Sequence, residues 1–498
     1  MILYNSHITE IIFRNLKKQR GVNSITTIWW ISITGTHLAE DILTIAKNLS
    51  QYGIKKGDRV AILVKDNILF TKIIVSSTLC GATIVLLDPL MWRHMMREKM
   101  IASWVKYLFI EGLLYDALFL SWFRLWQLWV ECIVHGLSFC WFLLQNTKSI
   151  SRRNDSPVIF HSLEDSTECM IVFTGGTTGN PKGVVHTVWS ICITAEKIGW
   201  LLRDSHIFYA DMPHFLLLGL LLEVEIVTWS YSIHPKKLQY IFEKYSIDTY
   251  FSPPYKYNFF IEHHIAIPKS LKNILLGSAP IYRWFLEKLY SVISHEQTVT
   301  CIYWMTEILP IAYIDGIEKL QFQGRGDLLW YLVDGIEYKI LDDELLLQWS
   351  HSMQSYLWKP REEYIATGDL VKFDHERIVM IGRRKDMIIR KEYNIYPSLY
   401  ETVMSQIPGV STVALVWIYD ENMHDECVVL FLETYPASLY TKQDIYLLLQ
   451  SGEYSIDQYA IPDDIIFTKI PKIGRHNKID KDTLRAIYHN QKISLIWK

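Results

Sequence analysis

The chain has 498 residues, of which 50% are hydrophobic and 21% charged, a composition typical of a globular protein with more than one domain. Its formal net charge of -3 argues against the basic surface that nucleic-acid-binding domains normally carry. The seven scattered cysteines form no CxxC pair and the N-terminus lacks a signal-peptide pattern, so we expect reduced thiols and a cytoplasmic protein.

The first predicted elements alternate between helix and strand. Apolar residues recur at helical spacing between Leu38 and Leu49, and Gly53 then fits the left-handed cap that ends many helices. A short buried strand is predicted over 58–64, followed by a helix and a strand over 73–89. This alternation predicts an α/β fold built in layers.

The segment 113–144 is very apolar and rich in tryptophan. Asp116, Arg124 and Glu131 interrupt it, whereas a membrane-spanning helix has ~20 apolar residues with almost no charge. We therefore expect buried helix and strand of a large domain and no transmembrane span. The alternative is peripheral contact with a membrane or a partner protein through the tryptophans.

A glycine-rich loop lies between two apolar runs in the stretch IVFTGGTTGNPKGVV, residues 171–185. Its backbone N–H groups, hydroxyls and single lysine suit a polyphosphate. The nucleotide-binding P-loop pattern GxxxxGK[ST] does not fit, because Gly183 follows Lys182 and a strand is predicted next. The predicted phosphate-binding residues are Thr174, Gly175, Gly176, Thr177, Thr178, Gly179 and Lys182.

Six further motifs follow in chain order: LLGSAP (275–280), YWMTE (303–307), DELLLQWSHSMQSYLW (343–358), YIATGDL (364–370), GRRKDMIIRKEYNIYP (382–397) and PKIGRHNKIDKDTLR (471–485). With the glycine-rich loop, they resemble the signature motifs of the adenylate-forming superfamily of acyl- and aryl-CoA synthetases, adenylation domains and luciferases. The resemblance extends over residues 36–485, nearly the whole chain.

The resemblance implies a fold and a reaction. We expect an α/β protein with a large N-terminal domain of packed α/β subdomains (1–384) and a small mobile α+β C-terminal domain (385–498). Such enzymes join a carboxylic acid to AMP from ATP, with Mg²⁺ bound and pyrophosphate released. We then expect transfer of the acyl group to CoA, which would be a further substrate.

The same resemblance assigns roles to single residues. Gly277, Ser278, Ala279 and Pro280 would stack on adenine with Tyr303. Thr306 would contact phosphate, Asp369 would accept both ribose hydroxyls, and Arg383 would reach phosphate or ribose. Lys385 would be the hinge between the domains. The implied catalytic residues are Glu307, which would hold Mg²⁺, together with Thr177, Lys182 and Lys478.

Four positions depart from the family pattern. Gly175 replaces Ser or Thr, and Leu216 replaces the histidine that gates the acid site. Trp304 replaces a glycine, and its indole would reshape or shorten the floor of the acyl pocket. Glu392 replaces a glycine of the hairpin that lines the pantetheine tunnel in CoA ligases, which weakens the expectation for thioester formation more than for adenylation.

The leading hypothesis is an AMP-forming acyl-CoA synthetase acting on a medium to long apolar acid, as in fatty acid metabolism. An amino-acid adenylation domain is less favoured, because no FDxS-like string supplies an ammonium-binding carboxylate. The strings TEILPIA and MPHFLLLG are similar to fatty-acid ligase-like proteins that include β-lactone synthetases of the olefin pathway. CoA-independent closure of a β-hydroxy acid is therefore an alternative, and a degenerate nucleotide-binding homologue is another.

Overall fold

The computed structural model describes residues 8–18, 23–27, 31–64, 66–87, 93–111, 131–135, 163–173, 182–211, 213–229, 235–279, 281, 283–329, 331–349, 352–374, 377–390, 393–420, 425–436, 438–454, 456–473 and 478–496. The glycine-rich loop from Thr174 to Gly179 lies outside these residues, as do Pro280 and Glu392. Of the tryptophan-rich segment 113–144, only the strand Glu131–His135 is described.

The largest sheet places several motif-bearing strand ends along one edge. Its eight strands have the order β14-β13-β12-β11-β9-β10-β1-β2. They are β1 (Asn23–Thr27), β2 (Ile31–Thr34), β9 (Ile207–Ala210), β10 (Glu225–Thr228), β11 (Thr249–Ser252), β12 (Asn273–Leu276), β13 (Thr298–Met305) and β14 (Ile308–Asp315). All neighbours pair in parallel except β1 with β2 and β13 with β14. The carboxyl ends of β9, β11, β12 and β13 therefore share an edge, where open α/β sheets bind ligands.

A second sheet has seven strands in the order β18-β8-β7-β4-β3-β5-β6. They are β3 (Arg59–Leu63), β4 (Thr83–Leu86), β5 (Tyr107–Glu111), β6 (Glu131–His135), β7 (Glu168–Phe173), β8 (Gly183–Thr187) and β18 (Ser355–Tyr356). The strands from β7 to β6 are parallel, whereas β8 runs antiparallel to both β7 and β18. The glycine-rich loop thus connects β7 to β8, and β18 lies beside the strand that follows the loop.

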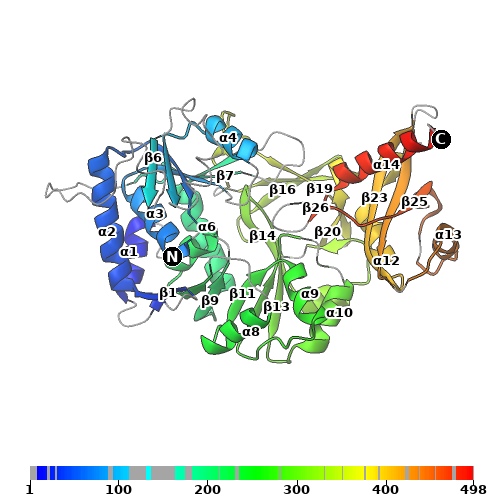
Figure 1. The fold of residues 1–498 in the computed structure, drawn as a ribbon, viewed down its shortest axis with the longest axis horizontal. Helices are drawn as coiled ribbons and strands as arrows, with labels where there is room; N and C mark the ends of the chain where they lie inside the picture. The colour runs from blue at the N-terminus through cyan, green and yellow to red at the C-terminus, as the bar shows by residue number, and fades with distance from the viewer. Residues whose placement is uncertain are drawn as a thin grey trace.

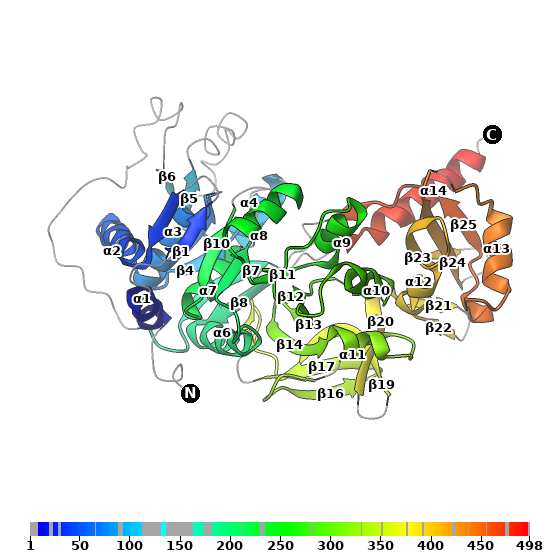
Figure 2. The ribbon, with the colours of Figure 1, turned by 90° about the horizontal axis from the view of Figure 1, so that it is seen from below.

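Helices cover both faces of the largest sheet, as Figures 1 and 2 show. The helices whose apolar faces share a core with both sheets are α1 (Ile8–Lys18), α2 (Gly35–Tyr52), α3 (Asn67–Leu79), α6 (Val188–Leu201) and α7 (Pro213–Leu221). Those packed elsewhere are α4 (Arg93–Ala102), α8 (Pro235–Lys244), α9 (Pro254–Glu262), α10 (Arg283–Val292) and α11 (Gly316–Gln321). The predicted glycine cap is confirmed: Gly53 ends α2 with a φ of 109°, and its N–H donates to the carbonyls of Leu49 and Ser50.

A third, antiparallel sheet forms the last part of the N-terminal domain. Its order is β15-β20-β19-β17-β16. The strands are β15 (Asp327–Leu328), β16 (Glu337–Leu341), β17 (Glu344–Gln348), β19 (Ile365–Asp374) and β20 (Arg377–Arg383). The short 3-10 helix η3 (Arg384–Asp386) follows β20 directly and contains Lys385. The proposed domain boundary at 384/385 falls within η3 and stays a prediction.

The C-terminal elements form a small α+β unit with buried cores of its own, at the right in Figure 1. Its strands are β21 (Ile388–Arg390), β22 (Tyr393–Ile395), β23 (Val410–Asp420), β24 (Asp425–Thr434), β25 (Asp464–Phe467), β26 (Lys472–Ile473) and β27 (Lys478–Ile479). Its helices are α12 (Pro397–Met404), α13 (Lys442–Gln450), η4 (Gln458–Ala460) and α14 (Lys481–Ile496). The expected fold, a large α/β domain with a small α+β domain after it, is confirmed.

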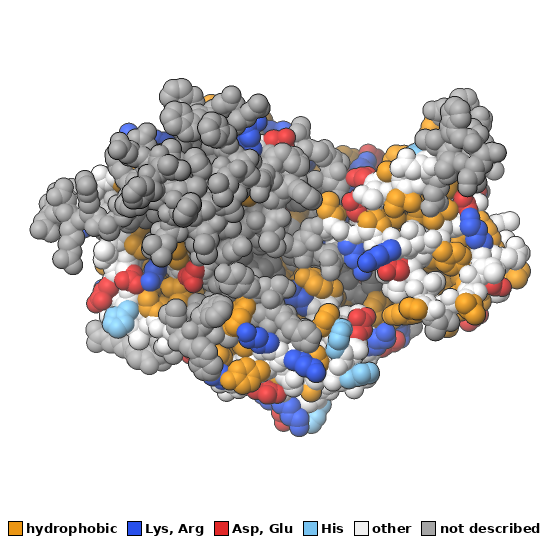
Figure 3. Space-filling model, viewed as in Figure 1, with side chains coloured by type: hydrophobic (Ala, Val, Ile, Leu, Met, Phe, Trp, Pro, Cys, Tyr) orange, Lys and Arg blue, Asp and Glu red, His pale blue; other side chains and the backbone are white. Residues whose placement is uncertain are grey.

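None of the helices in the described ranges is both long and apolar enough to cross a bilayer. On the described part of the face in Figure 3, basic, acidic and apolar side chains are interspersed, which agrees with the nearly neutral net charge.

Candidate active site

The predicted adenine loop begins where β12 ends, and close packing against β13 explains its glycine. A Cβ atom on Gly277 would lie 2.9 Å from the carbonyl oxygen of Ile302 and 3.0 Å from the Phe251 ring. Ser278 then has a φ of 66°, a left-handed conformation that is uncommon for a residue with a side chain. Ser278 and Ala279 remain partly exposed at the edge of the sheet, where a planar base could stack.

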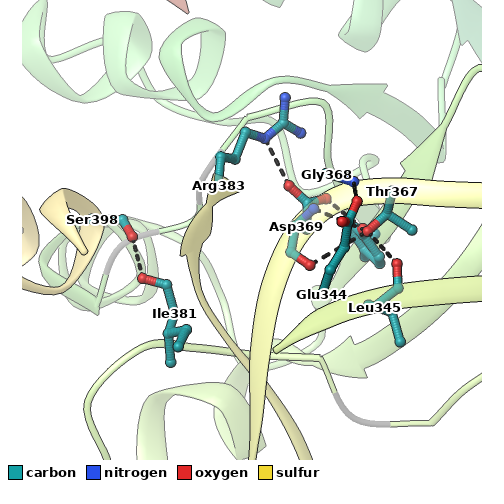
Figure 4. A network of polar contacts seen from close by, with 9 residues as sticks. Glu344, Leu345, Thr367, Gly368, Asp369, Ile381, Arg383 and Ser398 are labelled. Atoms are coloured by element: carbon teal, nitrogen blue, oxygen red, sulfur yellow. Dashed lines mark hydrogen bonds and ion pairs between the residues drawn. The ribbon is translucent and has the colours of Figure 1, made fainter. Parts of the chain in front are cut away.

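Asp369 is the centre of a polar network that joins three strands. It lies on β19 and is only 2% exposed. The Tyr303 hydroxyl, from β13, donates a hydrogen bond of 2.5 Å to Oδ2 of Asp369. Arg383 Nε, from β20, lies 2.8 Å from Oδ1, and Figure 4 shows this guanidinium facing the carboxylate. Burial and the nearby Asp369 raise the pKa of Tyr303 well above its ordinary value, so the phenol stays protonated as a donor.

The backbone around Asp369 is held by a second group of contacts, also drawn in Figure 4. Gly368 has a φ of 72°, and its N–H donates to Oε1 of Glu344 at 2.9 Å. The Asp369 N–H donates to the Thr367 hydroxyl at 3.0 Å. Arg384 Nε lies 2.8 Å from Oε2 of Glu344. These contacts fix the direction in which the Asp369 carboxylate points.

Lys478, on β27 of the C-terminal domain, faces this network. Its pKa lies below the ordinary lysine value, because the surroundings remove water from the ammonium group and because Arg383 and Lys385 repel it, while Asp369 acts in the opposite sense. Those interactions place the Lys478 ammonium in the neighbourhood of the Asp369–Arg383 pair. The residue as a whole is exposed, so its ammonium group is only partly shielded from water.

Two contacts hold the domains in this arrangement. Arg325, from the loop before β15, donates a hydrogen bond of 2.8 Å to Oδ2 of Asp457 in the C-terminal domain. The Ser398 hydroxyl, at the start of α12, donates to the carbonyl oxygen of Ile381 on β20 at 2.6 Å. The first contact is an ion pair between exposed side chains, so it is easily broken.

Glu307 occupies a tight turn between β13 and β14 and is 6% exposed. The Tyr356 hydroxyl donates to its Oε1 at 2.8 Å. Burial and the Glu307 carboxylate raise the pKa of Tyr356, so this hydroxyl also stays protonated. The Met353 N–H donates to the Glu307 carbonyl oxygen at 2.9 Å. Glu307 is thus held by its side chain and by its backbone.

His186, on β8, supports the same turn from the other side. Its Nε2 lies 2.9 Å from the carbonyl oxygen of Thr306. Burial lowers the pKa of His186 to about 4, so the ring is neutral at physiological pH and Nε2–H donates to that carbonyl. His186 therefore supports the Thr306–Glu307 turn.

Lys182 is the one predicted phosphate-loop residue within the described ranges. Its side chain is exposed, and its Nζ lies 4.9 Å from the centre of the Tyr356 ring. Because Tyr356 also bonds Glu307, this ring lies between the loop lysine and the predicted metal carboxylate.

The donor set around Glu307 fits Mg²⁺ that arrives with a nucleotide. Among the described residues, no group of three or more His, Cys, Asp and Glu could hold a metal ion alone. Mg²⁺ characteristically keeps several waters and binds one or two carboxylates together with substrate phosphates. Asp369 Oδ1 is buried and lies 2.8 Å from Arg383 Nε, so a ribose hydroxyl would have to displace an existing contact to reach this carboxylate.

The region predicted to hold the acid is nearly filled by aromatic rings. The Trp304 ring centre lies 4.2 Å from that of Phe251 and 5.9 Å from that of Phe215. A cavity of about 10 Å³ remains beside them. It is lined by Ile198, Leu201, Leu202, Phe208, Phe215, Phe251, Leu275, Ile302, Trp304 and Pro310. Leu216, at the position of the family's gate histidine, is a core residue with 1% exposure.

The fold and the arrangement of the motifs are those expected of an adenylate-forming enzyme, and comparison with known proteins confirms this class. The AMP-binding enzyme family matches residues 14–348, about two thirds of the chain. The chain belongs to the family of AMP-binding enzymes, which confirms the resemblance read from its motifs.

Curated relatives are AMP-forming acid–thiol ligases, the class of enzyme that the sequence predicted. The 2-succinylbenzoate–CoA ligase of Listeria monocytogenes serotype 4b (strain F2365) is 23% identical over 479 residues, which cover 91% of this chain and 94% of the relative. The ligase of the same name from Staphylococcus aureus (strain MSSA476) is 26% identical over 298 residues, 56% of this chain and 60% of the relative.

Solved structures share the fold over almost the whole chain. The o-succinylbenzoate coenzyme A synthetase of Bacillus subtilis, in complex with ATP and magnesium ion, has a TM-score of 0.79 at 18% identity, covering 95% of this chain and 99% of that one. An amide bond synthetase from Marinactinospora thermotolerans has a TM-score of 0.80 at 18% identity, covering 97% of this chain and 100% of that one. One fold therefore serves more than one acyl acceptor, and the fold alone does not identify the acceptor here.

Proposed function

We propose that this protein activates a compact, apolar carboxylic acid as acyl-AMP with ATP and Mg²⁺, and then transfers the acyl group to the thiol of CoA with release of AMP and the thiol proton. The observation that carries the proposal is the meeting of Tyr303, Asp369 and Arg383 with Lys478, which comes from the other domain. Polar side chains from separate motifs converge there, next to the strand end that leads into the Glu307 turn.

In the proposed first step, an acid carboxylate oxygen bonds to the α-phosphorus of ATP while the bond to pyrophosphate breaks. Asp369 would anchor the ribose, and Glu307 would hold Mg²⁺, which neutralises the leaving phosphates. Lys182 and the loop residues, Thr177 among them, would bind those phosphates. Lys478 would bridge the acid carboxylate and the α-phosphate. Charges fixed in this way stabilise the transition state more than the bound substrate.

The acid pocket supports a compact substrate. The cavity of about 10 Å³ beside Trp304 has no room for a fatty acyl chain unless the aromatic rings move. Its lining within the described residues is entirely apolar, with no cation to pair with the second carboxyl group of an acid such as 2-succinylbenzoate. We therefore propose a small apolar monocarboxylic acid and keep medium and long fatty acids as the competing outcome.

CoA is the proposed acceptor because the curated relatives are CoA ligases, and the same reason disfavours lactone formation. We also propose that the enzyme acts in the cytoplasm, where ATP and CoA are available. A membrane or partner contact through the 113–144 segment stays a prediction outside the described residues, apart from β6.

Pyrophosphate release tests the proposal directly. Purified protein would be assayed with ATP, Mg²⁺ and a panel that includes short and branched aliphatic acids, small aromatic acids, 2-succinylbenzoate and fatty acids of rising length. We expect release with compact apolar acids, and acyl-CoA in the mass spectrum once CoA is added. Release without thioester would favour a different acceptor. Tight ATP binding with no release from any acid would identify a nucleotide-binding homologue without ligase activity.

A further inference from the structure

We propose that Tyr356 is a positioning residue that couples the metal-binding carboxylate of Glu307 to the phosphate-loop lysine, Lys182. The inference rests on the proposed function, in which Glu307 and Lys182 act on the same nucleotide. Tyr356 is not itself a catalytic residue, since its hydroxyl is directed to Glu307 and it would act through its two neighbours.

Tyr356 contacts Glu307 through its hydroxyl and Lys182 through the face of its ring, and Lys359 Nζ lies farther from the same ring, 5.9 Å from its centre. The hydroxyl donates to Glu307 Oε1 at 2.8 Å, and the face of the ring lies 4.9 Å from Lys182 Nζ. Tyr356 and Glu307 are 7% and 6% exposed, so water competes little for this hydrogen bond. One side chain therefore sets the direction of the carboxylate and offers a site for the ammonium group.

The backbone fixes Tyr356 relative to both neighbours. Tyr356 on β18 pairs with Val184 on β8. Val184 lies two residues after Lys182 in the chain. The Leu357 N–H donates to the Gly183 carbonyl oxygen at 2.7 Å, while the N–H of Met353, four residues earlier, donates to the Glu307 carbonyl oxygen at 2.9 Å. The short segment 353–357 is thus bonded at one end to the exit of the phosphate loop and at the other to the Glu307 turn.

This arrangement has a clear physical use. A carboxylate that binds a metal is oriented by the hydrogen bonds it accepts, and removal of such an outer partner typically weakens metal binding about 10- to 100-fold. A cation over an aromatic face is held weakly but directionally. Tyr356 would keep Lys182 and Glu307 in a fixed arrangement, so that both side chains can act on the same bound nucleotide.

Two variants separate the hydroxyl from the ring. Tyr356→Phe removes only the bond to Glu307, and Tyr356→Leu also removes the aromatic face under Lys182. Tyr400→Phe is the matched control, because the Tyr400 hydroxyl donates to the Asp457 carboxylate at 2.7 Å and the residue is 4% exposed, far along the chain in the C-terminal domain. Binding of ATP would be measured by calorimetry without any acid, first in EDTA and then at increasing Mg²⁺.

We expect Tyr356→Phe to raise the Mg²⁺ concentration needed for half-maximal enhancement of ATP binding about tenfold, with binding in EDTA unchanged. Tyr356→Leu should also weaken binding in EDTA, about two- to fivefold. Tyr400→Phe should match the unmodified protein in both conditions. Melting temperatures of each variant would show which are folded, and Tyr356→Phe decides the matter alone if Tyr356→Leu does not fold.

A Mg²⁺ dependence of Tyr356→Phe within twofold of the control, or one shifted to lower Mg²⁺, would overturn the coupling. The binding measurement needs no acid, so it separates this inference from the proposed function. A protein that binds ATP with Mg²⁺ yet activates no acid would lose the ligase assignment while the role of Tyr356 could still hold. An unmodified protein whose ATP binding does not respond to Mg²⁺ would overturn the role of Tyr356.

Discussion

The nucleotide side of the site keeps the residues of the family motifs, whereas the acid side departs from them. On the nucleotide side, polar residues from β13, β19, β20 and β27 meet within hydrogen-bonding or electrostatic range, as the family motifs require. On the acid side, Trp304 and Leu216 replace the usual glycine and histidine, and apolar packing fills the space. The contrast agrees with the proposed function, in which the nucleotide chemistry of the family is kept and the acid is a compact apolar one.

The largest effect is expected from Lys478→Ala, which tests whether the nucleotide side is functional. Loss of one fixed charge at the transition state should lower the rate of pyrophosphate release roughly 10²- to 10³-fold, with ATP affinity nearly unchanged. The two are measured by a coupled pyrophosphate assay and by calorimetry. Lys472→Ala, at an exposed position on neighbouring β26, is the control. An unchanged rate would remove Lys478 from the chemistry of the adenylation step.

Trp304→Gly tests the acid side. Removal of the indole should open space beside Phe251 and shift the ratio of kcat/KM values toward longer acids by about 10- to 100-fold, since each methylene accommodated is worth roughly 1–3 kcal/mol. The measurement is pyrophosphate release over the same series of acids. Trp304→Phe keeps most of the ring and should retain the preference for compact acids. If the glycine variant keeps that preference too, the limit on acid size lies elsewhere in the pocket.

His186→Gln tests how much the neutral His186 ring, which supports the Glu307 turn, contributes to the stability of the fold. The unfolded chain protonates His186 near pH 6.5, whereas the folded protein does so only near 4, so the stability that depends on the neutral ring is lost as the pH falls between these values. We expect the free energy of unfolding of the unmodified protein to fall by about 3 kcal/mol more than that of the variant between pH 7 and pH 4. Unfolding followed by fluorescence at both pH values measures this difference, and equal losses would contradict it.

Arg325→Ala should have the smallest effect and tests the link between the domains. The ion pair with Asp457 joins two half-exposed side chains, so its loss should slow adenylation only about two- to threefold. The thioester step should not slow, because the pair belongs to the orientation that presents Lys478. Single-turnover assays separate the two steps. Lys272→Ala, which breaks an exposed pair with Glu296 inside the N-terminal domain, should change neither step.

The sequence predicted several secondary-structure elements and the family, because each of these depends on short local motifs. The helix between Leu38 and Leu49, its Gly53 cap and the strand after Lys182 were predicted from spacing alone and are present as α2 and β8. The order of the motifs was also enough to place the chain in its family. Strand order and the side chains that meet across sheets are set by tertiary packing, which spacing along one chain does not encode.

The contacts that the sequence missed all join distant segments. Tyr356 lies 49 residues from Glu307, and nothing in the string SYLW indicates that its hydroxyl reaches that carboxylate. Arg325 and Asp457 are 132 residues apart and belong to no motif. A tyrosine next to a strand is more often a core residue, so only the geometry could single out Tyr356. The roles assigned to single site residues by resemblance stay predictions until the variants are made.

The bond between Tyr303 and Asp369 has a consequence for how sugars are told apart. An incoming ribose hydroxyl does not meet a bare acceptor; it takes over a position that a phenol already occupies. The ribose hydroxyl therefore adds to the binding free energy only the difference between two similar hydrogen bonds. The preference for ATP over its 2′-deoxy analogue should be small. ATP could bind fully only after the Tyr303 side chain has moved away from Asp369. The phenol should therefore slow the association of ATP more than it weakens its affinity.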